Sequence, residues 1–363
     1  MEKFTEIAAA FQCRGSYLGE DPYGSGHIND TFKVCYDDGG QQVHYIHQRI
    51  NREVFRDVPA LMENIGRVTR HQRKKLKAAA VADPNRRVLT LVPTLEGEDY
   101  HIDSEGACWR TFEFIEGALG HDIVESLDQA FEVARAFGEF QGQLIDLPGR
   151  LHETIPDFHH TRSRFVDLQR AITADSHDRV REITDEIEFA LAREKMVDVV
   201  LDLMAAGEIP ERVTHNDTKL NNVLIDTTTG EGLCVIDLDT VMPGSILYDV
   251  GDMIRTTTST AKEDETDLSK VEMDIKHFEA IIMGYLKSAS GFIVPFERQL
   301  LAFSGRLISY ETGIRFLTDF LQGDVYFKTQ RERQNLDRCR SQFKMVKSIE
   351  RQMDAMRQIV KAC

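Results

Sequence analysis

The first third of the chain alternates apolar and polar residues in short runs that are rich in β-branched and aromatic side chains. Such runs are typical of strands, and they lie at residues 17–18, 31–36, 43–50, 87–93 and 109–115. The polar turn Asp37-Asp38-Gly39-Gly40 separates two of them, whereas residues 58–80 show helical spacing. We therefore expect a sheet with one helix packed on it.

After Gly117 the apolar residues recur with the period of a helix. The segments with this spacing are residues 128–144, 184–206, 274–288 and 297–321. Between Leu336 and Val360 an apolar stripe repeats at nearly heptad intervals. The stripe is short and impure, which favours a helix packed on its own part of the protein over an intermolecular coiled coil.

The change of pattern falls at Glu116-Gly117, which indicates a hinge. A chain of 363 residues can bury a substantial core and is long enough for two lobes. The expected fold class is α+β and bilobal. Residues 1–117 would form a small β-rich lobe that ends in the hinge, and residues 118–363 a larger, mostly helical lobe.

Acidic residues outnumber basic ones by 60 to 44, which gives a net charge of −16 and disfavours nucleic acid and anionic membranes as partners. The basic run at residues 70–77 is interpreted as the solvated face of a helix. No apolar segment approaches the ~20 residues of a membrane span. The start of the chain, MEKFTEIAAAF, lacks the basic and apolar regions of a signal peptide. We expect a cytoplasmic protein without an obligate protein partner.

Two groups of residues bear on metal binding. The cysteines contain no C-x-x-C pair, which fits reduced thiols and is poor material for zinc. They are Cys13, Cys35, Cys108, Cys234, Cys339 and Cys363. His152, His159 and His160 could be a metal cluster. A structural or hydrogen-bonding role is favoured, because adjacent His159 and His160 cannot both point one way on a strand and no cysteine lies close by.

The segment from His215 to Asn222 reads H-x-D-x-K-x-x-N. Phosphoryl transfer from a nucleotide needs a carboxylate beside the acceptor hydroxyl and oxygen ligands that hold magnesium on the phosphates. Asp217 and Asn222 have the spacing of the base and the metal ligand in a kinase catalytic loop. Asp217 alone would be interpreted as a helix N-cap. The complete set favours catalysis, with Asp217 as the base.

A second acidic signature, Asp237-Leu238-Asp239, follows an apolar run. Residues 223–226 and 233–236 flank a turn and should form a hairpin whose ends bring Asn222 and Asp237 side by side. Together these two side chains would offer Mg²⁺ a neutral and a charged oxygen. Asp239 is either an additional ligand or an acceptor behind the ligands, and the sequence leaves both open. Lys219 could neutralise charge on the migrating phosphoryl group, or be an exposed loop lysine.

The glycine turn Gly24-Ser25-Gly26 lies between two expected strands. Such a turn can lay backbone N–H groups on phosphate oxygens. The third glycine of a G-x-G-x-x-G motif is absent, because Asn29 stands there. A plain hairpin turn explains this segment equally well.

Several long segments together resemble the aminoglycoside phosphotransferase/choline kinase superfamily, over essentially the whole chain. They are residues 22–30 (PYGSGHIND), 45–51 (YIHQRIN), 158–161 (FHHT), 213–224 (VTHNDTKLNNVL), 235–255 (VIDLDTVMPGSILYDVGDMIR), 267–271 (DLSKV) and 313–327 (GIRFLTDFLQGDVYF). Within that superfamily the chain is most similar to the kinases of N-acetylhexosamines. The resemblance implies a protein-kinase-like fold with a nucleotide-binding N-terminal lobe and a catalytic, sugar-binding C-terminal lobe. It also implies transfer of phosphate from ATP, with Mg²⁺, to the anomeric hydroxyl of N-acetylglucosamine or N-acetylgalactosamine.

The resemblance also implies roles for individual residues. Asp217 and Lys219 would be catalytic, and Asn222 and Asp237 would hold the metal. The nucleotide would contact Gly24, Ser25, Gly26, Gln48, Glu113 and Ile115. The sugar would contact His27, Asp217, Arg315 and Tyr326. Arg315 also stands out on physical grounds, because it places a charge inside an apolar helix.

Two departures from the family pattern affect these expectations. The lysine that kinases carry on a strand is missing, and Gln48 or Arg49 stands near its place. Thr256-Thr257-Thr258 is polar where an aromatic residue is expected beside the sugar, so the preferred hexosamine could differ, or unmodified hexoses be admitted. The alternative acceptors are choline, homoserine or an aminoglycoside. A nucleotide-binding pseudokinase is disfavoured, because Asp217, Asn222 and Asp237 are all present.

Overall fold

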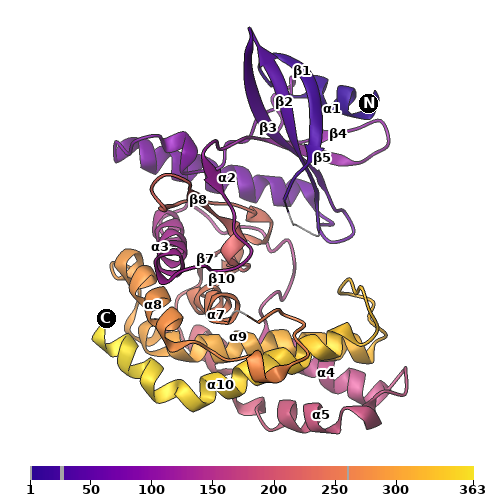
Figure 1. Ribbon diagram of the computed structural model, residues 1–363, viewed down its shortest axis with the longest axis vertical. Helices are drawn as coiled ribbons and strands as arrows, with labels where there is room; N and C mark the ends of the chain where they lie inside the picture. The colour runs from indigo at the N-terminus through magenta and orange to yellow at the C-terminus, as the bar shows by residue number, and fades with distance from the viewer. Residues whose placement is uncertain (1, 25–27, 260) are drawn as a thin grey trace.

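The computed structural model describes residues 2–24, 28–259 and 261–363. Figure 1 shows a sheet at one end of the molecule and helices at the other, with short strands between them. The sheet has five antiparallel strands in the order β1-β2-β3-β5-β4. Their bounds are β1 Ser16–Pro22, β2 Asp30–Asp38, β3 Gln41–Ile50, β4 His101–Ile102 and β5 Cys108–Glu113. The expected β-rich N-terminal part is confirmed.

Two helices pack on this sheet. The sequence pattern did not predict α1 (Glu2–Ala10), whose Ile7 packs with Val34, Tyr45 and Trp109 in a small core. The expected helix is α2 (Val58–Ala78), which Asp57 caps by accepting a hydrogen bond from the N–H of Ala60. The buried face of α2 belongs to the main core, which continues into the C-terminal part.

Residues 87–93 do not form the strand that the sequence predicts. The segment runs beside β5 and makes a single bridge, between Leu91 and Phe112. Val92 donates to Thr111, and Glu113 donates to Thr90. Pro93 has no N–H, so the ladder cannot continue through it.

The C-terminal part is mostly helical, as expected. Its helices are α3 Leu127–Leu144, α4 Thr161–Ala174, α5 Thr184–Leu191, α6 Val199–Ala205, α7 Ile246–Thr257, α8 Ile275–Ala289, α9 Pro295–Leu321 and α10 Gln334–Ala362. Its short strands pair as β6 Ala118–Leu119 with β8 Val223–Asp226, β8 with β9 Gly232–Val235, and β7 Arg212–Thr214 with β10 Met242–Gly244. The fold is therefore mixed α+β. Within the described residues, no helix combines the length and apolar character needed to cross a bilayer.

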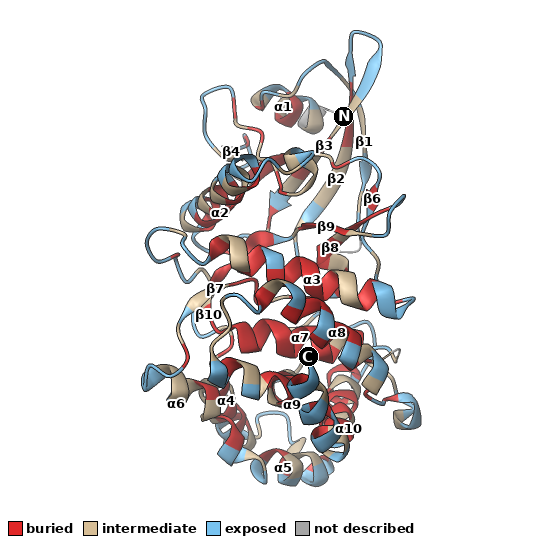
Figure 2. Cartoon of the chain, turned by 90° about the vertical axis from the view of Figure 1, so that its left-hand side faces the viewer, coloured by how far each residue is buried: buried red, intermediate tan, exposed pale blue. Residues whose placement is uncertain are grey.

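Besides α1, two helices of the C-terminal part were not predicted from the sequence, and one predicted helix was too long. All but one of the residues of α7 are buried, so this helix shows no polar face to reveal its period. Figure 2 shows that burial along α7. Helix α4 was also missed. The segment expected as one helix at residues 184–206 breaks into α5, a 3₁₀ turn at Glu194–Met196 and α6. Arg193, at the break, forms a two-pronged ion pair with Glu350 of α10.

The C-terminal stripe packs within its own part of the protein, as predicted. Its residues in α10 are buried in the cores formed with α8 and α9. Close approach of the helices depends on glycine. A Cβ atom at Gly251 of α7 would lie 2.5 Å from the Ser304 carbonyl oxygen of α9, and one at Gly313 would lie 2.7 Å from the Phe343 ring. These helices form a rigid base for the segments above them.

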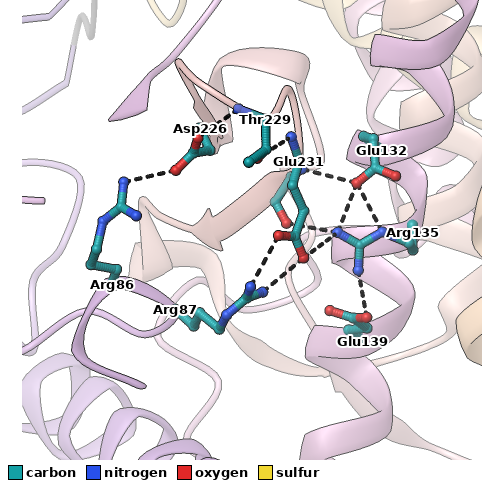
Figure 3. A network of polar contacts seen from close by, with 9 residues as sticks. Arg86, Arg87, Glu132, Arg135, Glu139, Asp226, Thr229 and Glu231 are labelled. Carbon is teal, nitrogen blue, oxygen red and sulfur yellow. Dashed lines mark hydrogen bonds and ion pairs between the residues drawn. The ribbon is translucent and has the colours of Figure 1, made fainter. Parts of the chain in front are cut away.

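An ion-pair network surrounds the expected hinge (Figure 3). Arg86 donates to the carbonyl oxygens of Glu116 and Gly117 and to the carboxylate of Asp226. Arg87 pairs with both oxygens of Glu231, at 2.9 and 3.0 Å. This network fastens the connecting segment to the β8–β9 hairpin. We propose that the hinge at Gly117 separates lobes formed by residues 1–117 and 118–363.

Candidate active site

The loop from His215 to Asn222 joins β7 to β8, and a buried carboxylate shapes it. Asp249 of α7 accepts hydrogen bonds from the backbone N–H groups of His215 and Asn216, at 2.9 and 2.7 Å. The Asp249 carbonyl accepts from the Thr218 hydroxyl at 2.6 Å. Asn216 has a positive φ of 66°, which asparagine tolerates better than most residues. Asp249 thus holds the backbone immediately before Asp217.

The His215 ring lies behind the loop. Its Nδ1 accepts from the backbone N–H of Asp217 at 3.3 Å, so the proton belongs on Nε2. That Nε2 donates to the Ile236 carbonyl at 2.9 Å. Phe137 and Phe140 contact the ring edge-on. His215 therefore connects the loop to the segment that leads to Asp237 through both of its ring nitrogens.

Asp217 lies between two partners that the sequence grouped with it. Lys219 Nζ is 2.9 Å from Asp217 Oδ1, and Asn222 Nδ2 donates to the Asp217 carbonyl at 2.8 Å. Burial would raise the pKa of the Asp217 carboxyl, but the charge and hydrogen bond of Lys219 outweigh it, so the pKa lies below its ordinary value. The carboxylate is consequently ionised at neutral pH and can accept a proton.

The hairpin brings Asn222 and Asp237 together, as predicted. The N–H of Ile236 donates to the Asn222 carbonyl at 2.9 Å, across the ends of β8 and β9. Asp237 has a positive φ of 57°, and its side chain reaches solvent. Loss of hydration, and then the charges of Asp239 and Asp217, raise the pKa of Asp237 to about 6. A nearby cation would favour its ionised form.

These oxygens fit a magnesium ion that keeps water and phosphate ligands. Mg²⁺ commonly takes one or two protein carboxylates and completes its shell with other oxygens. The Asn222 amide nitrogen is bonded to Asp217, which leaves the amide oxygen for a metal. No group of three or more His, Cys, Asp or Glu suited to a metal occurs in the described part of the chain. A site here would depend on phosphate oxygens.

The side chain of Asp239 accepts hydrogen bonds from residues of the N-terminal part. Both of its oxygens pair with the guanidinium of Arg110 on β5, and Asn29 Nδ2 donates to Oδ2 at 2.5 Å. In this arrangement Asp239 acts as an acceptor behind the candidate ligands. Arg110 was not among the residues singled out in the sequence. No local pattern marks it, because its partner lies 129 positions away.

The candidate nucleotide residues fall in two groups. Ser25 and Gly26 lie outside the described residues, and Gly24 has a positive φ of 83°. His27, a candidate sugar contact, also lies outside the described residues. On β3, Gln48 Oε1 accepts from Arg110 Nε at 3.0 Å, while Gln48 Nε2 donates to Thr31.

Three further residues complete this side of the site. Glu113 ends β5, and Ile115 is buried in the main core just beyond it. Arg49, the alternative to Gln48, forms an exposed pair with Asp30.

Two arginines lie on the acceptor side. Arg315 of α9 is half-buried between the rings of Phe158 and Phe327, at 5.4 and 5.7 Å, and no carboxylate among the described residues forms an ion pair with it. Arg164 of α4 donates to the backbone carbonyls of Asp157 and Phe158, and its buried Nε has no hydrogen-bond partner among the described residues. Burial and the positive charge of Arg315 lower the pKa of Arg164. Tyr326 is exposed, beside the Phe327 ring.

His159 connects this arginine side to the loop. Its Nδ1 is 2.7 Å from Glu311 Oε1, and its Nε2 is 3.1 Å from the Asn216 carbonyl. Both partners are acceptors, so both ring nitrogens must donate and the ring is an imidazolium. The other two histidines also make hydrogen bonds: His152 pairs with Glu63, and His160 caps α4. The preferred hydrogen-bonding role of all three is confirmed.

The threonines after Arg255 close α7. Thr256 donates to the Asp252 carbonyl and Thr258 to the Ile254 carbonyl. Arg255 forms ion pairs with Asp252 and Glu263, and these carboxylates balance its positive charge. The sequence did not mark Asp249 or Glu311 as functional. The available signal was an acidic residue inside an apolar helical run, which normally requires a buried partner.

A cavity of about 630 Å³ lies elsewhere, between α2, α3, β9 and Phe292. Charged residues at its walls include Lys75, Arg87 and Glu139. None of the residues that line it is a candidate site residue from the sequence, so the cavity is separate from the loop chemistry.

Comparison with known proteins places this geometry in a family. An aminoglycoside phosphotransferase from Alicyclobacillus acidocaldarius has a TM-score of 0.64 at 13% identity, covering 99% of this chain and 96% of that one. A microcompartment-associated aminopropanol kinase has a TM-score of 0.57 at 15% identity and covers 98% of both chains. A Plasmodium vivax ethanolamine kinase has a TM-score of 0.54 at 15% identity, covering 93% of this chain and 83% of that one.

Sequence identities this low show only that the fold is shared. Membership of a family follows from the match between the sequence and a family model. The profile of the phosphotransferase enzyme family matches residues 21–274, well over half of the chain. The match includes the loop with Asp217 and Asn222 and the turn with Asp237. The chain therefore belongs to the phosphotransferase enzyme family and has its protein-kinase-like fold.

Proposed function

We propose that this small-molecule kinase transfers the γ-phosphoryl group of ATP to the anomeric hydroxyl of an N-acetylhexosamine, N-acetylglucosamine or N-acetylgalactosamine. The products would be ADP and the sugar 1-phosphate. Family membership supports the reaction class. The acceptor rests on the sugar-kinase motifs and on the charge of the acceptor side.

The proposed chemistry centres on Asp217. The acceptor hydroxyl would donate its proton to the ionised Asp217 carboxylate as its oxygen forms the bond to phosphorus and the bond from phosphorus to the ADP oxygen breaks. Lys219, 2.9 Å from Asp217, would lie close enough to offset charge on the moving phosphoryl group. Asn222 and Asp237 would hold Mg²⁺, which supplies positive charge to the phosphate oxygens.

The observation that carries the acceptor assignment is the pair Arg164 and Arg315. Neither guanidinium forms an ion pair within the described residues, and both contact Phe158, next to His159, which contacts the loop. An ammonium group would be repelled there. A neutral sugar with an acetamido group instead offers a carbonyl oxygen that a guanidinium can bind.

Two alternative functions can be distinguished from the proposed one. The structural relatives include proteins named as kinases of aminopropanol and ethanolamine, so a choline, homoserine or aminoglycoside acceptor is the nearest alternative. Choline and aminoglycosides are cationic and would be repelled by the two arginines, whereas homoserine is a zwitterion and is separated from a sugar by direct assay. A pseudokinase is a weaker alternative, because Asp217, Asn222 and Asp237 are all present and adjacent.

An acceptor panel tests the proposal. The protein is incubated with ATP and Mg²⁺ and with N-acetylglucosamine, N-acetylgalactosamine, glucose, choline, homoserine or kanamycin, and ADP release is measured. We expect turnover of the N-acetylhexosamines and not of choline, homoserine or kanamycin. Turnover of choline, homoserine or kanamycin alone would refute the sugar assignment. No ADP release with any acceptor, together with no nucleotide binding, would refute kinase activity.

The contribution of the acceptor arginine can be isolated with Arg315→Met, which keeps much of the side-chain volume. We expect KM for the N-acetylhexosamine to rise by at least roughly tenfold, while KM for ATP stays within twofold. The matched control is Arg170→Met on α4, whose exposed side chain pairs only with Asp167. Equal sugar KM values for Arg315→Met and the control would contradict the role of Arg315.

A further inference from the structure

One buried ion pair joins the N-terminal sheet to the turn that carries Asp237. Arg110 is 1% exposed and Asp239 is 3% exposed. The guanidinium of Arg110 meets both oxygens of Asp239, with the NH2–Oδ2 bond at 3.0 Å. Burying two charges costs free energy unless their geometry is well matched, so such a pair is costly to break from one side.

Asp239 belongs to a short turn whose conformation needs support. The turn is the 3₁₀ segment Leu238–Thr240, and Asp237 precedes it in the left-handed conformation. For a residue with a Cβ atom this conformation is unfavourable, because the Cβ atom approaches the following carbonyl oxygen. On the far side, the Thr240 hydroxyl donates to the His215 carbonyl at 2.7 Å, and Asn216 donates to the Thr240 carbonyl at 2.8 Å. The catalytic loop therefore holds one end of the turn.

The other end is held by the sheet, through the Arg110–Asp239 pair. Asn29 joins the same carboxylate, and its Oδ1 accepts from the N–H of Asn51 at 3.0 Å. Gln48 accepts from Arg110 Nε, so the strand position where kinases carry a lysine is tied to the same guanidinium. Strand β3, which is expected to meet the nucleotide, and the turn after Asp237, which is expected to hold the metal, thus converge on this pair.

We propose that Arg110 and Asp239 are positioning residues for the metal–nucleotide complex, and that their pair links the sheet, in which the strand lysine is missing, to the metal-binding turn. Arg110 acts through Asp239, which fixes the backbone of Asp237 so that its carboxylate faces the same point as the Asn222 oxygen. Asn29 supports the same carboxylate by donating a hydrogen bond to it. The inference rests on the proposed function, because it takes Asp237 as a magnesium ligand.

A purely structural ion pair would affect stability alone, whereas a positioning pair must affect how much Mg²⁺ strengthens nucleotide binding. The readout is the dissociation constant of ADP, measured by calorimetry on the full chain with and without Mg²⁺. The variants are Asp239→Asn, Arg110→Lys and the double variant Arg110→Met/Asp239→Leu. The last removes both charges and leaves none buried, so it remains informative if a single variant fails to fold.

We expect Asp239→Asn and the double variant to weaken ADP binding by tenfold or more in the presence of Mg²⁺ and by less than twofold in its absence. Arg110→Lys, which keeps the charge but not the two-pronged geometry, should fall between them and the wild type. The matched control is Glu350→Gln, which breaks the two-pronged pair with Arg193 far from the loop. It should leave both dissociation constants unchanged.

The possible results distinguish a failure of this inference from a failure of the proposed function. If folded variants keep the full Mg²⁺-dependent gain in ADP affinity, the Arg110–Asp239 pair has no positioning role and the inference is overturned. If the wild-type protein binds no nucleotide, with or without Mg²⁺, the proposed function fails and not merely this inference. Equal weakening with and without Mg²⁺ would also contradict the proposal, because it would place the effect on the nucleotide alone.

Discussion

At the scale of single residues, Asp217 combines an ionised carboxylate with a fixed position. Lys219 keeps its pKa low, and Asn222 and His215 hold its backbone from two sides. The spacing H-x-D-x-K-x-x-N was enough to group these side chains, because all of them belong to one loop. Asp237 could be added because the hairpin that carries it is local in sequence.

Replacing Asp217 by Asn keeps its size and removes the proton acceptor. We predict a fall in kcat of about 10²–10⁴-fold, because the acceptor hydroxyl loses its base. Binding of ADP should change by less than threefold, since nucleotide contacts are expected elsewhere. Initial rates and calorimetry check these two values. A variant with wild-type turnover would remove Asp217 from the mechanism.

The residues that the sequence could not supply act across long distances. Arg110 reaches Asp239, Asp249 of α7 reaches the catalytic loop, and Glu311 of α9 reaches His159. Such pairs leave no periodic signal, because each partner is fixed by the folding of other segments. The contacts expected of Ser25, Gly26 and His27 stay predictions, since these residues lie outside the described part of the chain.

At the scale of elements, helices α7 and α9 determine where the loop lies. Asp249 binds the loop backbone directly, whereas Glu311 acts through His159. The sequence predicted α9 from its helical apolar spacing but did not predict α7, because a helix buried on all sides lacks the amphipathic period. It also joined α5 and α6, since apolar spacing continues across the break at Arg193.

The His159–Glu311 pair should make stability depend on pH. Burial alone would lower the pKa of His159, but the charge and hydrogen bond of Glu311 raise it above its ordinary value. The stabilisation is therefore fully present below the unfolded pKa of about 6.5 and is lost as pH rises through the higher folded value. The free energy of unfolding, measured in urea from pH 6 to 9, should fall with rising pH.

In His159→Gln the free energy of unfolding should depend less on pH, because the titrating ring is absent. The variant should also be less stable by about 3 kcal/mol at pH 6, since Glu311 is left buried without its cation. His152→Gln is a matched control, because His152 pairs with Glu63 at the surface. An identical pH slope in His159→Gln and the wild type would contradict the assignment of an imidazolium.

At the scale of the whole molecule, the two parts meet through polar contacts as well as through the main core. One set lies at the hinge, where Arg86 and Arg87 bind the β8–β9 hairpin. The other is the Arg110–Asp239 pair beside the candidate metal turn. The overall bilobal class follows from the change of hydrophobic period near Gly117, whereas these contacts between distant segments could not be read from it.

The chain as a whole is negatively charged, whereas the side proposed to bind the acceptor carries positive charge. The chain has a net charge of −16, yet Arg164 and Arg315 lie together without carboxylate ion-pair partners among the described residues. A local positive region in an acidic protein is informative, because the overall field would otherwise favour cationic ligands. This contrast separates the proposed N-acetylhexosamine from the amino alcohols and aminoglycosides named for its structural relatives.

The position of the phosphate on the product tests the central claim most directly. The protein is incubated with ATP, Mg²⁺ and N-acetylglucosamine or N-acetylgalactosamine, and the product is examined by mass spectrometry and by phosphorus–proton NMR. We predict a sugar monophosphate whose phosphorus couples to the anomeric proton. A phosphate on any other hydroxyl, or no phosphorylated sugar in a preparation that phosphorylates choline, homoserine or kanamycin, would contradict the assignment.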